Sequence, residues 1–199
     1  MRKRIAAFLA IVATTSLAVP SQALAFEESN GNANNVVVVQ NRQGGAFKNK
    51  ARSLLVHNGG PSVANGNAAV ARASCTDCRT VAVAVQVVVL EGPVSDFRPE
   101  NAAVALNETC VRCQTFAYAR QEVLDPGRPV RIGDGAQERV SQIEGQIRDL
   151  ASSTEPFVQL TADLDNLTVQ LVDVVRGEVN RAGATAKVDE RRQVDRRED

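Results

Sequence analysis

The chain has 199 residues, with 23 basic and 23 acidic side chains, and aromatic residues fill only 4% of its positions. Such a charge balance argues against nucleic acid or an anionic membrane surface as the ligand, because neither would be held electrostatically. The scarcity of aromatic rings, with no tryptophan, argues against an aromatic sugar-binding platform.

The first 25 residues have the three parts of a secretory leader. Basic residues at positions 2–4 precede the uncharged, apolar residues 5–19, and an Ala-Leu-Ala motif ends at Ala25, before Phe26. A membrane anchor is the alternative, but this apolar stretch is shorter than the roughly 20 residues that cross a bilayer. We therefore expect cleavage between Ala25 and Phe26, and a secreted or extracellular protein, associated with the cell envelope or free, with no stable membrane span.

Removal of the signal peptide, residues 1–25, leaves 174 residues with 20 basic and 23 acidic side chains, enough for one core with an appendage. Outside the cytoplasm, the four cysteines of the chain are expected to be oxidised. Residues 26–34 are polar and contain Asn-Gly, which predicts a flexible lead-in.

An internal repeat dominates residues 35–125. Segments 67–88 and 101–123 share N-A-A-V-A, followed after three or four residues by C-x-x-C-x-T-x-A-x-A-x-Q-x-V. Asn35–Asn41, with the sequence NVVVVQN, is a candidate degenerate copy of the first strand without cysteines. The repeat carries every cysteine of the chain: Cys75, Cys78, Cys110 and Cys113.

Each copy predicts a strand, a tight reversal at the Cys-x-x-Cys and a second strand. The second strand alternates with period two, and its constant face of Thr, Ala and Gln suggests close approach of another layer. On the other face, Arg120 and Glu122 predict exposure to solvent. Val81–Leu90 is apolar on both faces and is therefore expected at the centre of the sheet, with Thr115–Leu124 nearer an edge.

The spacing of apolar residues changes after residue 127, and it predicts a helical hairpin for residues 128–180. Asp134 and Gln137 resemble a capping box, and two apolar series with spacings of three and four residues follow, on either side of Pro156. One long helix kinked at Pro156 is the alternative. Residues 181–199 are rich in charge and predict a disordered tail.

The expected fold is therefore α+β. About six antiparallel strands form a sheet from three hairpins, two of which carry a Cys-x-x-Cys, and a C-terminal helical hairpin packs on the sheet or extends from it. The apolar helix stripes have two interpretations. They complete the core, or they mediate self-association through residues 135–175 or bind a helix of a partner.

The paired Cys-x-x-Cys motifs are compatible with three chemistries. Disulfides are favoured, because the ends of a tight turn lie within the Cα separation that a disulfide needs, but the spacing leaves the connectivity open. The alternative is a zinc site with Cys75, Cys78, Cys110 and Cys113 as its four ligands. A thiol-exchange site is the third, although reactive pairs of this kind usually begin a helix rather than precede a strand.

No motif for hydrolysis or phosphate binding is present. His57 is the only histidine and is expected at a strand end, in a turn or on the surface, rather than as a catalytic base. Gln86 and Gln121 hold equivalent interior positions, and we expect each to bond to a neighbouring strand or to the other glutamine.

The strings ASCTDCRTVAVAVQ (73–86) and CVRCQTFAYA (110–119), followed by a charged helical C-terminus, resemble a set of uncharacterised exported proteins of high-GC Gram-positive bacteria. This resemblance covers roughly residues 35–175 and implies export and a compact architecture, without an activity. We expect a secreted or envelope-associated, non-enzymatic binding or structural module with no cofactor and an unidentified protein or envelope partner. The alternative is a zinc-binding or thiol-redox protein that uses the two cysteine pairs.

Overall fold

The computed structural model describes residues 28–198, so the predicted signal peptide and its cleavage site at Ala25 and Phe26 lie outside the described residues. Most strands belong to two sheets, which we call the narrow sheet and the wide sheet. The narrow sheet has the order β2-β5-β8 and consists of β2 (Asn35–Asn41), β5 (Gly66–Ala73) and β8 (Glu100–Asn107). The wide sheet has the order β1-β3-β6-β9-β10 and consists of β1 (Glu28–Asn30), β3 (Phe47–Asn58), β6 (Arg79–Leu90), β9 (Gln114–Asp125) and β10 (Lys187–Glu198).

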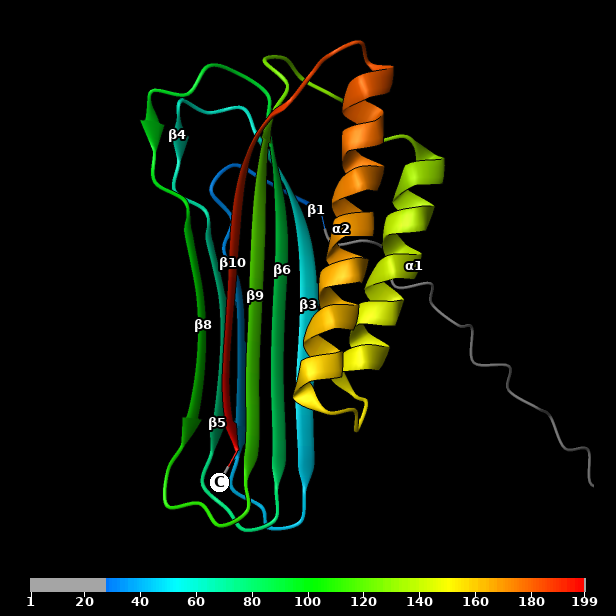
Figure 1. The fold of residues 1–199 in the computed structure, drawn as a ribbon. Coiled ribbons are helices and arrows are strands. Elements are labelled where there is room, and N and C mark those ends of the chain that lie inside the picture. The colour runs from blue at the N-terminus through cyan, green and yellow to red at the C-terminus, as the bar shows by residue number, and fades with distance from the viewer. Residues whose placement is uncertain (1–27, 199) are drawn as a thin grey trace, which may run out of the picture.

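The chain winds through both sheets in successive coils (Figure 1). Each coil follows one strand of the narrow sheet, turns, and returns along a strand of the wide sheet. The first two coils then cross back through the short strands β4 (Ser62–Val63) and β7 (Asp96–Phe97), which pair in parallel with each other. Equivalent strands of neighbouring coils pair in parallel and in register, so that Asn67 lies opposite Asn101. The described residues thus form a parallel β-solenoid of three coils.

The predicted antiparallel sheet of three hairpins is wrong. The strands that flank each Cys-x-x-Cys belong to different sheets, and each of them pairs with the equivalent strand of a neighbouring coil. A tight turn between two alternating strands suits the corner of a coil as well as it suits a hairpin, and a period of two does not distinguish the two arrangements. Among the described strands, only β9 and β10 pair antiparallel.

The two sheets enclose an interior of small side chains. The constant face of the repeat points into it, as its small residues suggested, and alanines of opposing strands pack there at 0% exposure: Ala69, Ala71, Ala82, Ala84, Ala105, Ala117 and Ala119. Alanine stacks on alanine in the second and third coils, and Val37 and Val39 stand at the equivalent positions of the first coil. This interior is therefore narrow and apolar along most of its length.

Polar amides form two ladders across the coils within the same interior. Asn35 Nδ2 donates to Asn67 Oδ1 at 2.9 Å, and Asn67 Nδ2 donates to Asn101 Oδ1 at 2.7 Å. Gln121 Nε2 donates to Gln86 Oε1 at 2.8 Å, which confirms the pairing expected for these two glutamines. A buried amide without partners is costly, so each ladder favours one register of the coils.

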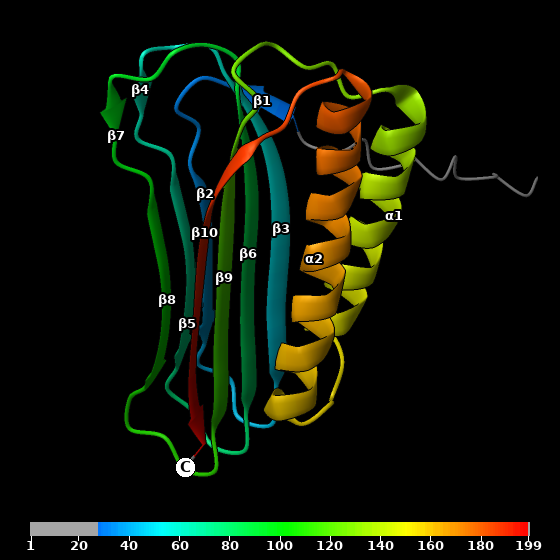
Figure 2. The same ribbon diagram turned by 45° about the horizontal axis from the view of Figure 1, so that its top comes forward.

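The helices α1 (Asp134–Ala151) and α2 (Phe157–Arg181) form the predicted hairpin, and residues 152–156 separate them, which excludes a single kinked helix. The N-cap of α1 is Gly133 and makes no side-chain cap bond, so the expected capping pair does not form. Both helices cover the side of the wide sheet that faces away from the narrow sheet (Figure 2). No helix among residues 28–198 is long and apolar enough to cross a membrane.

The apolar stripes of the helices are occupied within the chain. They pack on the outward side chains of β6 and β9, in one core cluster with Val81, Val83, Phe116 and Tyr118. The stripe residues at 0% exposure are Val140, Ile147, Leu160 and Leu164. The stripes therefore complete the core. Their buried side chains are not available for self-association through residues 135–175.

Arg120 and Glu122 were predicted to face solvent, but both are buried, because α2 and β10 cover this part of the wide sheet. Their exposed fractions are 6% and 2%. Arg120 Nη2 donates to Glu122 Oε1 at 2.8 Å and lies 2.8 Å from Oε1 of Glu190 on β10. Burial raises the pKa of Glu122 from its usual range in spite of the neighbouring Arg120.

The C-terminal segment is a strand, contrary to the disordered tail that its charge predicted. β10 pairs with β9 along its whole length, and its inward side chains reach the free edge of β8. Gln193 Oε1 and Asp195 Oδ2 accept the backbone N–H groups of Ala103 and Ala105 at 3.2 and 3.0 Å. Polar side chains thus replace the hydrogen bonds of a further coil and close this end of the solenoid.

Residues 28–34, expected to be part of a flexible lead-in, are likewise ordered. β1 pairs in parallel with the end of β3, opposite Leu55–His57. Asn32 Oδ1 accepts from Asn58 Nδ2 at 3.0 Å, and Ala33 O accepts from Gln86 Nε2 at 2.9 Å. This segment therefore supplies a backbone acceptor to the glutamine ladder and a side-chain acceptor to Asn58.

Asn67→Ala should destabilise the fold by about 2–4 kcal/mol in urea unfolding, because it removes the middle member of the asparagine ladder and leaves buried groups without partners. Asn166→Ala, at an exposed position of α2, is the matched control and should change the free energy of unfolding by about 0.5 kcal/mol or less. Equal losses in the two variants would show that the ladder contributes nothing specific.

Glu122→Gln should alter the pH dependence of stability. The folded-state pKa of Glu122 is raised, so its contribution is full at low pH and is lost as pH rises through that pKa. The unfolding free energy of the variant, relative to the wild type, should therefore increase between about pH 4 and about pH 7. Glu138→Gln, at an exposed carboxylate of α1, is the control. A relative stability that falls over this range would mean that the pairing with Arg120 outweighs burial.

Candidate functional site at the cysteine turns

Two stacked turns at one end of the solenoid hold all four cysteines. They connect β5 to β6 and β8 to β9, and an isolated parallel bridge joins Thr76 to Val111. Asp77 N–H donates to Val111 O at 2.9 Å, and Val111 N–H donates to Cys75 O at 3.2 Å. The coil stacking therefore continues through the turns.

The third residue of each turn has a left-handed backbone. The φ angles are 55° at Asp77 and 53° at Arg112, a region that costs energy for residues other than glycine. These equivalent residues form an exposed ion pair between the turns, with Arg112 Nη2 donating to Asp77 Oδ2 at 2.5 Å. Hydrogen bonding from Arg112 lowers the pKa of the Asp77 carboxyl. The pair joins the two turns on their solvent side.

Each turn is closed by its own disulfide. Cys75 bonds to Cys78 with a Cα separation of 6.2 Å, and Cys110 bonds to Cys113 with a separation of 5.7 Å. This settles the connectivity that the sequence left open. Cys78 and Cys113 are 3% and 0% exposed, whereas Cys110 is only partly buried.

The two disulfides are in contact with each other. Cys78 Sγ lies 3.3 Å from Cys113 Sγ, and the Sγ atoms of Cys75, Cys78 and Cys113 all lie within 4.8 Å of one another. Around a tetrahedral zinc with bonds of about 2.3 Å, sulfur atoms would be about 3.8 Å apart. Three of the four predicted zinc ligands are thus close enough for a shared metal, and Cys110 falls outside this group.

The first coil has no cysteine at the equivalent corner, and an asparagine spans the turn instead. Asn41 Nδ2 donates to Ala46 O at 2.8 Å and to Arg79 O at 3.1 Å. Gly45 N–H donates to Thr76 O at 2.9 Å, which attaches this corner to the first cysteine turn. Hydrogen bonds therefore hold the first corner, and disulfides hold the other two.

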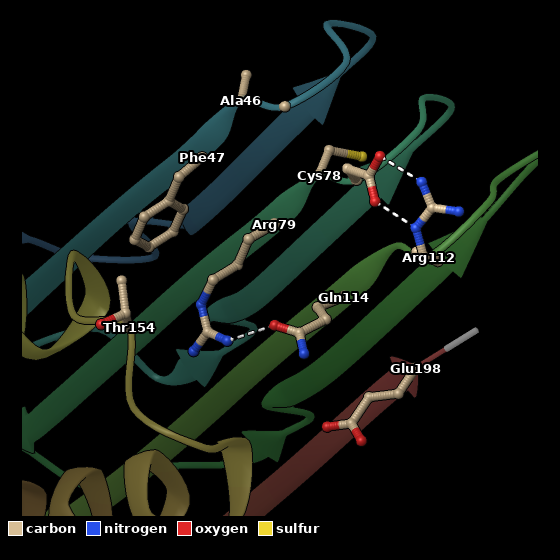
Figure 3. Close-up of a pocket in the computed structure, with 10 residues that line it drawn as sticks. Ala46, Phe47, Cys78, Arg79, Arg112, Gln114, Thr154 and Glu198 are labelled. Atoms are coloured by element: carbon tan, nitrogen blue, oxygen red, sulfur yellow. Dashed lines mark hydrogen bonds and ion pairs between the residues drawn. The ribbon is translucent and has the colours of Figure 1, made fainter.

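An open cavity of about 420 Å³ lies beside the turns (Figure 3). Arg79 extends across it, with its guanidinium carbon 4.2 Å from the centre of the Phe157 ring and 5.6 Å from that of Phe47. Its Nη1 donates to Gln114 Oε1 at 2.8 Å and its Nη2 donates to Glu155 O at 2.6 Å. Burial lowers the pKa of the Arg79 guanidinium from its usual range. Arg79 thus connects the solenoid to the loop between the helices.

The cavity contains few groups that could act on a substrate. It is lined by Gly45, Ala46, Phe47, Asp77, Cys78, Arg79, Arg112, Gln114, Thr154 and Glu198. The charged side chains Asp77 and Arg112 bind each other, and Arg79 is held by aromatic rings and acceptors. Cys78 is the only lining residue with a sulfur atom, and that atom is in a disulfide.

His57 lies near the end of β3, as expected, opposite Val89 of β6, whereas the cysteine turns lie at the beginning of β6 and β9. Its Nδ1 is 2.8 Å from Oε1 of Glu91, and its side chain is 13% exposed. Gln86 and Gln121 lie in the interior, where they bond to each other and to backbone carbonyls. The structure therefore does not bring these residues together with the cysteines.

A second surface feature is the face of the narrow sheet that points away from the wide sheet. Its exposed apolar side chains are Val36 and Val38, each 50% exposed, Val104 at 36% and Leu106 at 40%. Arg72 and Glu108, near the cysteine turns, are the charged residues at its end and bind each other. In both ribbon views no other described element covers this face.

Sequence reasoning missed two contributors to this architecture. Asn67 and Asn101 stand first in the repeated N-A-A-V-A, and their recurrence was the available signal for a ladder. Arg79 follows the first cysteine pair, but the equivalent residue of the second pair is Gln114, so the repeat gave no hint of its role. Its contacts come from the helical hairpin, far away in sequence.

No protein-family model matches the sequence, and no match to a curated protein or to a solved structure was found. The function must therefore be argued from the site itself.

Proposed function

We propose that the protein is a non-enzymatic, secreted or envelope-associated module in which disulfides stabilise a β-solenoid that binds a protein partner. The observation that carries this proposal is the pair of stacked disulfides, each closed within its own turn. Disulfides persist in oxidising compartments, so they support export. A bridge across so short a loop contributes about 2 kcal/mol and fixes the corner of a coil.

The charged groups around the turns also support a structural role. Arg79, Asp77 and Arg112 each bind other parts of the same chain. The remaining charged residue that lines the cavity is Glu198, and the lining contains no histidine, lysine or free thiol that could pair with it. Catalysis by proton transfer needs a titratable group within reach of the substrate. The site therefore suits stabilisation better than turnover, and the proposal includes no cofactor.

The exposed face of the narrow sheet supports the binding part of the proposal. Four aliphatic side chains from β2 and β8 are at least one-third exposed there, and contiguous apolar surface commonly marks a protein interface. The solenoid holds these side chains at fixed positions. We propose that a protein of the cell envelope contacts this face.

A zinc-binding protein is the second candidate, and the grouping of three sulfur atoms within 4.8 Å favours it over other metal sites. Reduction of both disulfides would be required first, because thiolates are the ligands. In the oxidised structure Cys110 stands apart from this group. A zinc site with four cysteine ligands needs all four sulfur atoms close together, so the position of Cys110 favours disulfides over zinc.

Mass spectrometry of the purified mature protein distinguishes the two candidates. Alkylation under denaturing conditions without reductant should modify no cysteine, and the mass should be four hydrogen atoms below that of the reduced chain. The chain should begin at Phe26. A sample reduced before alkylation should gain four adducts. Four alkylated thiols together with one equivalent of zinc would replace the disulfide proposal with the zinc candidate.

Site-specific photocrosslinking tests the binding face in cells that export the protein. A photoreactive residue at Val38 or Val104 should give a crosslinked protein adduct, because both side chains are exposed on the narrow sheet. The same residue at Arg139, exposed on α1, should give none and is the matched control. Adducts from Arg139 alone, or from no position, would contradict the assignment of this face.

A further inference from the structure

The contact between the two disulfides has a chemical consequence beyond the proposed structural role. We propose that they form a thiol-exchange pair: an external dithiol reduces Cys110–Cys113, and Cys113 then attacks Cys78 to form a new disulfide between coils. The 3.3 Å separation of Cys78 Sγ and Cys113 Sγ carries the proposal. The substrate class is a small dithiol or the dithiol of another protein.

Exposure decides where the external dithiol attacks. Cys110 is the partly exposed member of its pair, whereas Cys113 is fully buried. Attack of a thiolate needs access to one sulfur of the disulfide and expels the other. Attack on Cys110 therefore expels Cys113 as a thiolate in the interior, next to Cys78.

The second step is an exchange within the chain. The Cys113 thiolate forms a bond to Cys78 Sγ, the Cys75–Cys78 bond breaks, and Cys75 leaves as a thiolate that takes up a proton. Cys75 Sγ lies 3.3 Å from Asn41 O, so the released thiol has an acceptor in place. Resolution of the mixed disulfide by the second thiol of the reductant frees Cys110 and yields the oxidised dithiol.

The exchange is balanced and needs no further reactant. Two electrons pass from the dithiol to the protein, which begins with two disulfides and ends with Cys78–Cys113 and two thiols. In the end state Cys75 and Cys110 are reduced. Each turn thus ends with one free thiol, and the remaining disulfide joins the two turns.

The backbone allows the new bridge without rearrangement of the strands. Cys78 and Cys113 immediately precede the paired residues Arg79 and Gln114, and Gln114 N–H donates to Cys78 O at 2.9 Å. Neighbouring parallel strands lie about 4.8 Å apart, within the roughly 4.4–6.8 Å Cα range of disulfides. Reduction would therefore exchange a bridge within each turn for one that joins the second and third coils.

Limited reduction of the wild-type protein tests this sequence of steps. The oxidised mature protein is treated with a limiting amount of dithiothreitol, and free thiols are alkylated before trypsin digestion. Trypsin cuts after Arg72, Arg79, Arg112 and Arg120, which places Cys75 and Cys78 in peptide 73–79, Cys110 in peptide 80–112 and Cys113 in peptide 113–120.

Peptide 73–79 linked to peptide 113–120, with Cys75 and Cys110 alkylated, is the expected two-electron product. Alkylation of Cys110 and Cys113 with the Cys75–Cys78 bridge intact would show independent disulfides and overturn the proposal. Alkylation of Cys75 and Cys78 with Cys110–Cys113 intact would also overturn it, because the first attack would then be at the buried turn.

A matched pair of variants isolates the internal step. In Cys110→Ser, Cys113 starts as a free thiol beside Cys78, so both Cys75 and Cys113 should become alkylated as the bridges interconvert. In Cys113→Ser, only Cys110 should react, because Cys110 lies outside the group of three close sulfur atoms. Alkylation confined to Cys113 in the first variant would contradict the exchange.

Discussion

The side-chain amide of Asn67 accepts a hydrogen bond from Asn35 and donates one to Asn101, so a single column of asparagines joins all three coils. This column exists only if equivalent residues of successive coils lie side by side. The same register places alanine on alanine between the sheets, glutamine on glutamine further along, and one cysteine turn on the other. A shift by one residue would turn the amides outward and bring alanines to the helix side. The helical hairpin also depends on this register, because it packs on the outward side chains of β6 and β9.

Each coil turns sharply between its narrow-sheet strand and its wide-sheet strand, and two kinds of interaction hold these turns. At the first corner Asn41 spans the turn with two hydrogen bonds, and at the next two a disulfide does so. Stacking of these corners brings Cys78 and Cys113 into contact, which isolated turns would not do. The proposed exchange chemistry therefore results from coil stacking, whereas stabilisation of a corner by its disulfide needs only the individual turn.

The local elements were largely predictable, and their pairing was not. Alternation in residues 79–90 and 114–125 indicated strands, and the apolar spacing after residue 134 indicated two helices. The distance of 34 residues between Asn67 and Asn101 was the overlooked signal for a solenoid, because a period of this length is typical of stacked coils. β10 could not be recognised, because ten of its twelve residues are polar. Its polar side chains bind the edge of β8 and helix α2, and within this strand only Val194 packs against the main core cluster. The charges of Arg120 and Glu122 suggested exposure to solvent, because the elements that cover them, Glu190 of β10 and helix α2, are distant in sequence.

The two ends of the solenoid differ in when they can be completed. Each strand of the second and third coils pairs with the equivalent strand of the coil before it. A chain that is synthesised from its N-terminus therefore always presents a strand edge on which the next strand can pair, and we call this edge a template. The last template, formed by β8 and β9, has no successor coil, and residues 187–198 cover it only after both helices have been made. The nascent chain therefore exposes unpaired strand edges until residues 187–198 have been made. In this protein β10 acts as a stop for strand addition, and ten of its twelve residues are polar, which disfavours the use of one molecule as the template for another.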